Sequence, residues 1–160
     1  MGAAAQRWAH GRRLVDVVRD FAARGDRVVI EVAGQSFNGT VAAVGDDRVD
    51  VETTTALVSI RTALGDSTTS VTSPIVVRRS SPAVGGSRRL PPALATFRAR
   101  LLELEHLEAA VRIGTLVSDR EYVGTLVVGL DQVLVRGDVD VVLPACWVGY
   151  VAVDAGELGS

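Results

Sequence analysis

The side chains that most often catalyse reactions or bind metals are few and scattered in this sequence. His10 and His106 each lack a second ligand at the short spacing of a zinc site. Cys146 is the only cysteine, which excludes an internal disulfide and a multi-cysteine metal site, and we interpret it as a small packed residue. The adjacent acids Asp46 and Asp47 lie at a predicted turn, where carboxylates commonly serve the turn itself.

Motifs of the common enzyme classes are also absent from the sequence. It contains no phosphate-binding loop, no dinucleotide fingerprint and no serine nucleophile elbow. We therefore predict a non-enzymatic protein with no catalytic residues, no metal and no cofactor.

Arginine is the one chemically versatile residue that is abundant. All 17 basic residues are arginine, in a chain of 160 residues with a net charge of −2. Guanidinium groups suit phosphate contacts better than ammonium groups do. The alternative is codon bias in a GC-rich genome, since Ala, Val and Gly are abundant as well.

Two arginine doublets are the best candidates for binding nucleic acid. Arg78-Arg79 and Arg88-Arg89 bracket a stretch rich in Gly, Ser and Pro. Their contacts to phosphates would be sensitive to salt and weakly selective for sequence. Further candidates in the helices and their flanks are Arg12, Arg13, Arg98 and Arg100. The alternative is a solvated linker whose charges bind nothing.

The elements that must position these residues follow a helix-then-strands pattern that occurs twice. Apolar residues at helical spacing predict a helix over 12–24 that ends at Gly25. Alternating apolar residues then predict strands over 28–32, 37–44, 48–53, 56–60 and 75–77. In the third of these strands, we expect Arg48, Asp50 and Glu52 to face water.

The second part of the chain repeats this order. Pro91 and Pro92 predict the first turn of a second helix, with an apolar stripe at Leu94, Phe97, Leu101 and Leu104. Strands are predicted over 113–117, 122–128, 132–136, 139–143 and 147–153. We therefore expect a first unit at 1–77, an Arg/Gly/Ser/Pro-rich linker at 78–92 and a second unit at 93–160.

A pairwise match between the two parts indicates a diverged duplication. Phe37, Gly39 and Thr40 correspond to Tyr122, Gly124 and Thr125, and a turn and a valine-rich strand follow in both parts after a one-residue difference. We expect Gly39 and Gly124 to lie where a strand bends sharply. We expect Phe37 and Tyr122 to be core residues.

The glycine and turn spacing resembles the first motif of the Sm/LSm family of SH3-like small β-barrels. The resemblance implies a mainly-β (α+β) fold of two five-stranded barrels, each preceded by an amphipathic helix. It also implies an oligomer that pairs strand edges and binds nucleic acid, with RNA favoured over DNA. Apolar edge candidates are 75–77 and 148–153.

This sequence departs from the family pattern at the positions that hold RNA. Asp50 and Leu134 occupy the slot of the family's base-binding Asn, and the Arg-Gly turn of its second motif is missing. The RNA pocket is therefore expected to be lost or moved. This leaves open a protein–protein adaptor or scaffold whose barrels bind no nucleic acid.

No apolar run approaches the ~20 residues of a membrane span, and arginines interrupt the N-terminal apolar stretch. We expect a soluble cytoplasmic protein that does not associate with membranes.

Overall fold

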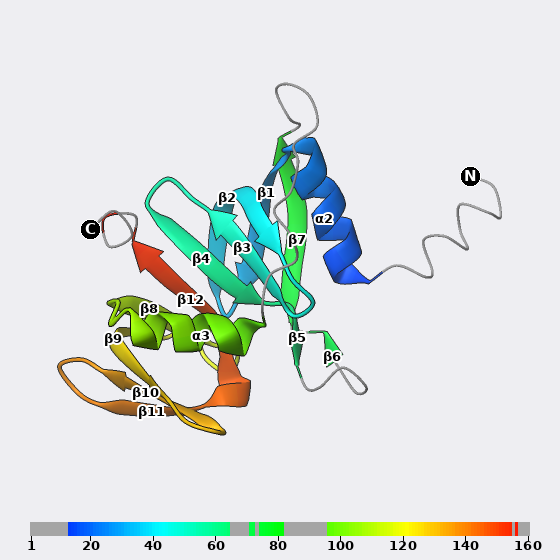
Figure 1. The fold of residues 1–160 in the computed structure, drawn as a ribbon. Helices are drawn as coiled ribbons and strands as arrows, with labels where there is room; N and C mark the ends of the chain where they lie inside the picture. The colour runs from blue at the N-terminus through cyan, green and yellow to red at the C-terminus, as the bar shows by residue number, and fades with distance from the viewer. Residues whose placement is uncertain (1–12, 65–70, 73, 82–95, 155, 157–160) are drawn as a thin grey trace.

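The computed structural model describes residues 13–64, 71–72, 74–81, 96–154 and 156. In these residues the chain is mainly β, with two α-helices and one antiparallel ten-stranded sheet (Figure 1). The elements of the first unit are α2 (Leu14–Arg24), β1 (Arg27–Val32), β2 (Gln35–Val44), β3 (Arg48–Glu52), β4 (Ala56–Arg61) and β7 (Ile75–Ser81). Those of the second unit are α3 (Phe97–His106), β8 (Val111–Thr115), β9 (Glu121–Val128), β10 (Gln132–Arg136), β11 (Val141–Pro144) and β12 (Val148–Asp154).

The ten strands repeat one arrangement. The sheet runs β11-β10-β9-β8-β12-β4-β3-β2-β1-β7. In each unit four consecutive strands therefore pair in sequence, and the unit's last strand pairs with its first. The two sets meet where β12 pairs with β4. A short sheet of β5 (Ala63–Leu64) and β6 (Val71–Thr72) lies apart, and the sequence pattern did not predict it.

The helix α2 begins and ends as its sequence predicts. The Asp16 carboxylate accepts a hydrogen bond of 2.9 Å from the backbone N–H of Arg13, and Gly25 ends the helix with a φ of 76°. The buried side is centred on Val15 and Val18. Leu14 and Phe21, two of the apolar residues whose helical spacing predicts this helix, are partly buried and pack against the core from its margin.

The helix α3 begins at Phe97, after Thr96, whose hydroxyl caps the helix by accepting a hydrogen bond of 3.1 Å from the N–H of Ala99. Phe97, Leu101 and Leu104 are buried, which confirms their place in the predicted stripe. The prolines predicted to open this helix, and Leu94, lie outside the described residues.

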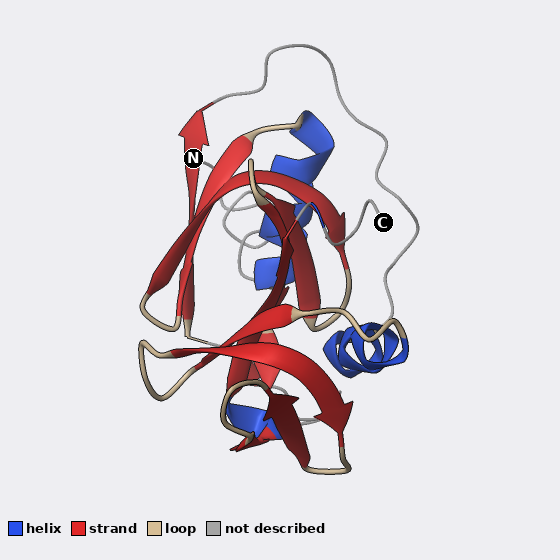
Figure 2. Cartoon of the chain, turned by 90° about the vertical axis from the view of Figure 1, so that its left-hand side faces the viewer, coloured by secondary structure: helices blue, strands red, loops and turns tan. Residues whose placement is uncertain are grey.

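Each helix covers a separate hydrophobic cluster. The first cluster combines α2 with β1–β4, and the second combines α3 with β8–β12. Figure 2 shows the two groups of strands one above the other, with α2 beside the upper group and α3 near their junction. The carboxylate of Glu105 accepts a hydrogen bond from the backbone N–H of Val128, which ties α3 to β9.

Three expectations differ from the structure. The strand β7 continues to Ser81, so Arg78 and Arg79, at the start of the predicted linker, belong to a strand that pairs with β1 over its whole length. Arg48 and Asp50 are buried and paired at 2.8 Å rather than turned to water. The two five-stranded sets form one continuous ten-stranded sheet, and the two separate five-stranded barrels that the resemblance implies are not seen in the described residues. The pattern missed these points because long-range pairing, not local periodicity, decides them.

Candidate assembly interface

The two units place one glycine each at the equivalent position of their second strands. Gly39 lies opposite Val28 in β1, and Gly124 lies opposite Val111 in β8. A Cβ added to Gly39 would lie 2.1 Å from the carbonyl oxygen of Glu52, and one added to Gly124 would lie 2.1 Å from that of Arg136. In each unit the glycine therefore lets the backbone of the second strand approach the backbone of the third strand closely.

The one-residue difference between the units is a β-bulge. Val41 pairs with Val51, but the next pair joins Ala43 to Asp50, so Ala42 is the extra residue of β2. In the second unit Leu126 pairs with Val135 and the pairing continues without a shift. Asp50 and Leu134 therefore correspond to each other in the pairing of the strands as well as in the comparison of the sequences.

The junction of the units is a strand pair of five residues. Tyr150 of β12 lies opposite Ile60 of β4, and Asp154 lies opposite Ala56. Side chains of β12 alternate between the two cores: Val151 and Val153 belong to the second cluster, whereas Tyr150 and Ala152 belong to the first. The last strand of the second unit thus completes the core of the first.

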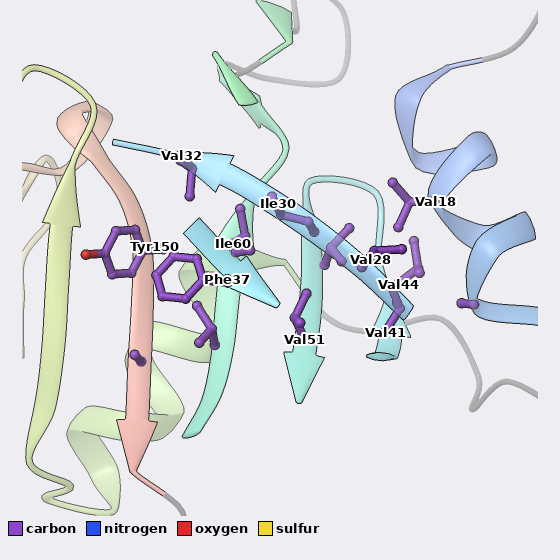
Figure 3. Packing of buried hydrophobic residues seen from close by; sticks show 14 of the residues in the cluster. Val18, Val28, Ile30, Val32, Phe37, Val41, Val44, Val51, Ile60 and Tyr150 are labelled. Carbon is purple, nitrogen blue, oxygen red and sulfur yellow. The ribbon is translucent and has the colours of Figure 1, made fainter. Parts of the chain in front are cut away.

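Tyr150 is the centre of this shared core. It is fully buried, and its ring meets the ring of Phe37 edge-on, with centroids 4.7 Å apart (Figure 3). Its hydroxyl donates a hydrogen bond of 2.6 Å to the Glu121 carboxylate, which also lies 3.4 Å from the guanidinium of Arg112. Burial and then the contact with Glu121 raise the pKa of Tyr150 well above the usual value for tyrosine.

Arg61 lies next to Ile60, at the same end of the junction as Tyr150, and contacts the second unit there. Its Nη1 donates to the carbonyl oxygens of Ala145 at 2.7 Å and Val148 at 3.5 Å, and the guanidinium lies over the Phe97 ring, 5.5 Å from the centroid. Burial lowers the pKa of Arg61, and the nearby Asp47 carboxylate opposes that shift. One side chain of the first unit therefore holds the backbone between β11 and β12 and the start of α3.

The described sheet ends at β7 on one side and at β11 on the other, and these strands lie well apart in the molecule (Figure 1). The prediction of 148–153 as an edge is wrong, because this segment is β12 and pairs with both β4 and β8. Val76 on β7 is 56% exposed, and Val142 on β11 is 64% exposed. Exposed strand edges of this kind present unpaired backbone groups and apolar side chains to other chains. They are the most distinctive surface feature of the described residues.

The predicted nucleic-acid residues do not gather into one patch. Arg78 and Arg79 are exposed on β7, and Arg78 lies 3.7 Å from Glu31. Arg98 is exposed but donates a hydrogen bond of 2.9 Å to the carbonyl oxygen of Gly129. Three of the remaining candidates, Arg12, Arg88 and Arg89, lie outside the described residues.

Two helix arginines complete the set of candidates. Arg100 is buried on α3 and pairs with Glu103 at 2.6 Å, so it is not available to a phosphate. Arg13 is exposed at the start of α2. Of the candidate arginines in the described part of the chain, Arg98 and Arg100 therefore make contacts within the fold rather than forming a phosphate-binding patch.

The candidate catalytic side chains are also dispersed. His106 is exposed. Cys146 is exposed as well, so the interpretation of it as a small packed, buried residue is wrong. The Asp47 carboxylate accepts a hydrogen bond of 2.9 Å from the backbone N–H of Phe97. Within the described ranges, no three His, Cys, Asp or Glu side chains are grouped as metal ligands. His10 lies outside the described residues.

Sequence reasoning missed Tyr150 and Arg61, the two residues that join the units. Tyr150 carried a weak signal, as a large aromatic residue within a strand of small apolar residues. Arg61 carried none beyond its position at the end of a strand. Their roles depend on contacts more than 80 residues apart in sequence, which no local pattern encodes.

No helix in the described residues has the length and apolar character needed to cross a membrane. Comparison of the chain with models of protein families, with curated proteins and with solved structures finds no match.

Proposed function

We propose that the protein is a non-enzymatic scaffold whose activity is self-assembly through the edges of its β-sheet. Each five-stranded unit is a small barrel of the Sm-like type, and the units are modules that join by strand pairing. The observation that carries the proposal is the β12–β4 junction, at which one unit has already used its last strand to complete the other. The equivalents of β12 and β4 are β7 and β11, and among the described residues each of these two strands has a neighbour on one side only.

Nucleic-acid binding is the second candidate function. The exposed doublet Arg78-Arg79 favours it, since a rigid strand would present both guanidinium groups to a phosphate chain. The buried position of Arg100 and the backbone contact of Arg98 favour the scaffold. Both candidates agree on a protein without catalytic chemistry, metal or cofactor.

Mass and binding measurements distinguish the two functions. Sedimentation and light scattering across a range of concentrations are expected to give particles heavier than the 16.8 kDa chain. Single-stranded RNA and duplex DNA are expected not to bind, even at low salt. A chain that stays monomeric at every concentration would overturn the scaffold. Salt-sensitive binding that weakens when Arg78, Arg79, Arg88 and Arg89 become Ala would instead establish the nucleic-acid function.

A further inference from the structure

The internal junction provides a template for contact between two chains. In the first unit β4 pairs with the last strand of the second unit, whereas β11, the strand equivalent to β4, pairs only with β10 in the part of the chain that the structure describes. In the same way β7, the strand equivalent to β12, pairs there only with β1, so both strands have an open edge among the described residues. The partner that β11 lacks would be a strand equivalent to β12, and β7 at the other end of the molecule is such a strand.

Pairing within the units fixes which residues are equivalent. Ser59 on β4 lies opposite Asp50, and Val142 on β11 lies opposite Leu134, so Ser59 corresponds to Val142. Val77 on β7 is equivalent to Val151 on β12 by the same reasoning, because they lie opposite Ile30 and Ile113, which correspond to each other.

We propose that a second copy of this chain docks head-to-tail, with its β7 pairing antiparallel to β11 in the register of the β12–β4 junction. This inference rests on the proposed scaffold function and names the surfaces through which it operates. Transferring the junction register pairs Val76 with Leu143, Val77 with Val142, Arg78 with Val141 and Arg79 with Asp140. Pro144, which has no backbone N–H, lies one position beyond the last pair and marks the end of the pairing.

Charge complementarity supports this partner. Arg79 is exposed on β7, and within the described residues it makes no ion pair. Asp140 is exposed immediately before β11, two residues after the exposed Asp138. In the internal junction the same position holds Leu57 opposite Val153, so the arginine and the aspartate occur only at the two open edges. Opposite charges directly across an antiparallel pair stabilise it.

Apolar burial supports the same arrangement. Of the ten large apolar side chains exposed in the described residues, nine lie in the second unit and the tenth is Val76. Val76 corresponds to Tyr150, which fills the first core beside Phe37. In the described residues, the apolar side chains of the second cluster all come from the second unit, and its counterpart of Phe37, Tyr122, stays partly exposed. A docked β7 would supply the missing side chain.

Because the two surfaces differ, the contact is heterologous, and repeating it closes a ring or extends a filament. An assembly of any number of copies uses the same interface. An assembly that closes into a ring leaves neither β7 nor β11 unpaired. The proposal therefore concerns the register of the contact and not the number of copies.

Charge reversal tests this register in the full chain. Arg79→Asp and Asp140→Arg each place like charges across the contact, and each is expected to weaken association roughly tenfold or more in sedimentation. The double reversal restores an opposite pair and is expected to recover most of the association. Arg120→Asp and Asp46→Arg, at exposed positions outside β7 and β11, are the matched controls and are expected to leave assembly unchanged.

A cross-link provides the second measurement. In a chain with Cys146→Ser, cysteines placed at 79 and 140 are expected to form a disulfide between chains, since directly opposed residues have Cβ atoms ~5 Å apart. Assembly that is unchanged by both Arg79→Asp and Asp140→Arg, or cysteines that stay unlinked in assembled protein, would overturn the register while leaving the scaffold function in place. A monomer under all conditions would overturn both.

Discussion

Glycine serves the same purpose at two single positions of this protein. At Gly39 and Gly124 the absence of a Cβ lets the backbone pass a carbonyl oxygen at a distance that no side chain tolerates. The two contacts involve equivalent residues, Glu52 and Arg136. This agreement supports the duplication that the sequence indicates, because unrelated folds would not place both glycines against the same neighbour.

Replacing either glycine by alanine is expected to destabilise the protein. The added methyl group must push apart two backbone segments that cannot yield like a flexible side chain, at a cost of about 3 kcal/mol each. Chemical unfolding monitored by circular dichroism measures the loss. Gly156→Ala is the control, because a Cβ there meets nothing within 4 Å. Equal stability of all three variants would contradict the assigned role of the glycines.

The phenol of Tyr150 makes the stability of the protein sensitive to alkaline pH. Its pKa is raised in the folded chain from the usual value near 10, so folding favours the neutral phenol. This contribution is fully present below about pH 10 and is lost as the pH rises further. Tyr150→Phe is expected to lower the unfolding free energy by about 1–2 kcal/mol at neutral pH, through loss of the hydrogen bond to Glu121.

Urea unfolding from pH 8 to 11 measures this dependence. Wild-type protein is expected to lose stability above pH 10 more steeply than Tyr150→Phe, so that the two curves converge. Tyr122→Phe, at a partly buried tyrosine of the same sheet, is the control and should keep the wild-type slope. Parallel curves for wild type and Tyr150→Phe would show that the phenol does not govern the alkaline loss.

At the scale of elements, β4 and β11 have the same place in their units but opposite surroundings. The central residue of β4 is Ser59, which is buried under the junction, and its hydroxyl has no hydrogen-bond partner among the described residues. The equivalent residue of β11 is Val142, which is exposed at the open edge. A polar residue is thus buried where a strand already pairs, and an apolar residue is exposed where we propose that one docks.

Removing the hydroxyl of Ser59 is expected to be harmless or favourable. Ser59→Ala eliminates an unpartnered buried polar group without changing the backbone pairing, so stability should stay equal or rise by about 1 kcal/mol. Thermal unfolding measures the change. Thr115→Ala is the comparison, because the Thr115 hydroxyl lies 3.2 Å from that of Ser118, and its loss should be destabilising. A clear loss of stability in Ser59→Ala would indicate that the hydroxyl has a partner in solution.

At the scale of the whole molecule, the two units are expected to unfold together. The first core contains Tyr150 and Ala152 from the last strand of the second unit, so opening of the second unit removes part of the first. The chain therefore behaves as one cooperative body although each helix covers its own cluster.

Tyr150→Ala tests this coupling. It is expected to cost about 3–5 kcal/mol and to reduce hydrogen-exchange protection of the β1 amides, Val28 to Ile30, although these residues lie in the other unit. Tyr122 is the residue of the second unit that corresponds to Phe37, and Tyr122→Ala is the control. It should affect the β1 amides much less. Unchanged protection of β1 in Tyr150→Ala would show that the units open independently.

The amino-acid sequence alone determined the repeating elements of this protein. The helix that ends at Gly25, the strand 132–136 and the match of Gly39 with Gly124 follow from patterns within a few residues, because helix and strand periods and the need for a missing Cβ are local properties. Only the tertiary structure decided that β12 pairs with β4, that Arg61 binds the backbone near β11, and that Arg48 and Asp50 are buried. These contacts join distant parts of the chain, and their free energy depends on which surfaces meet, which local spacing does not specify.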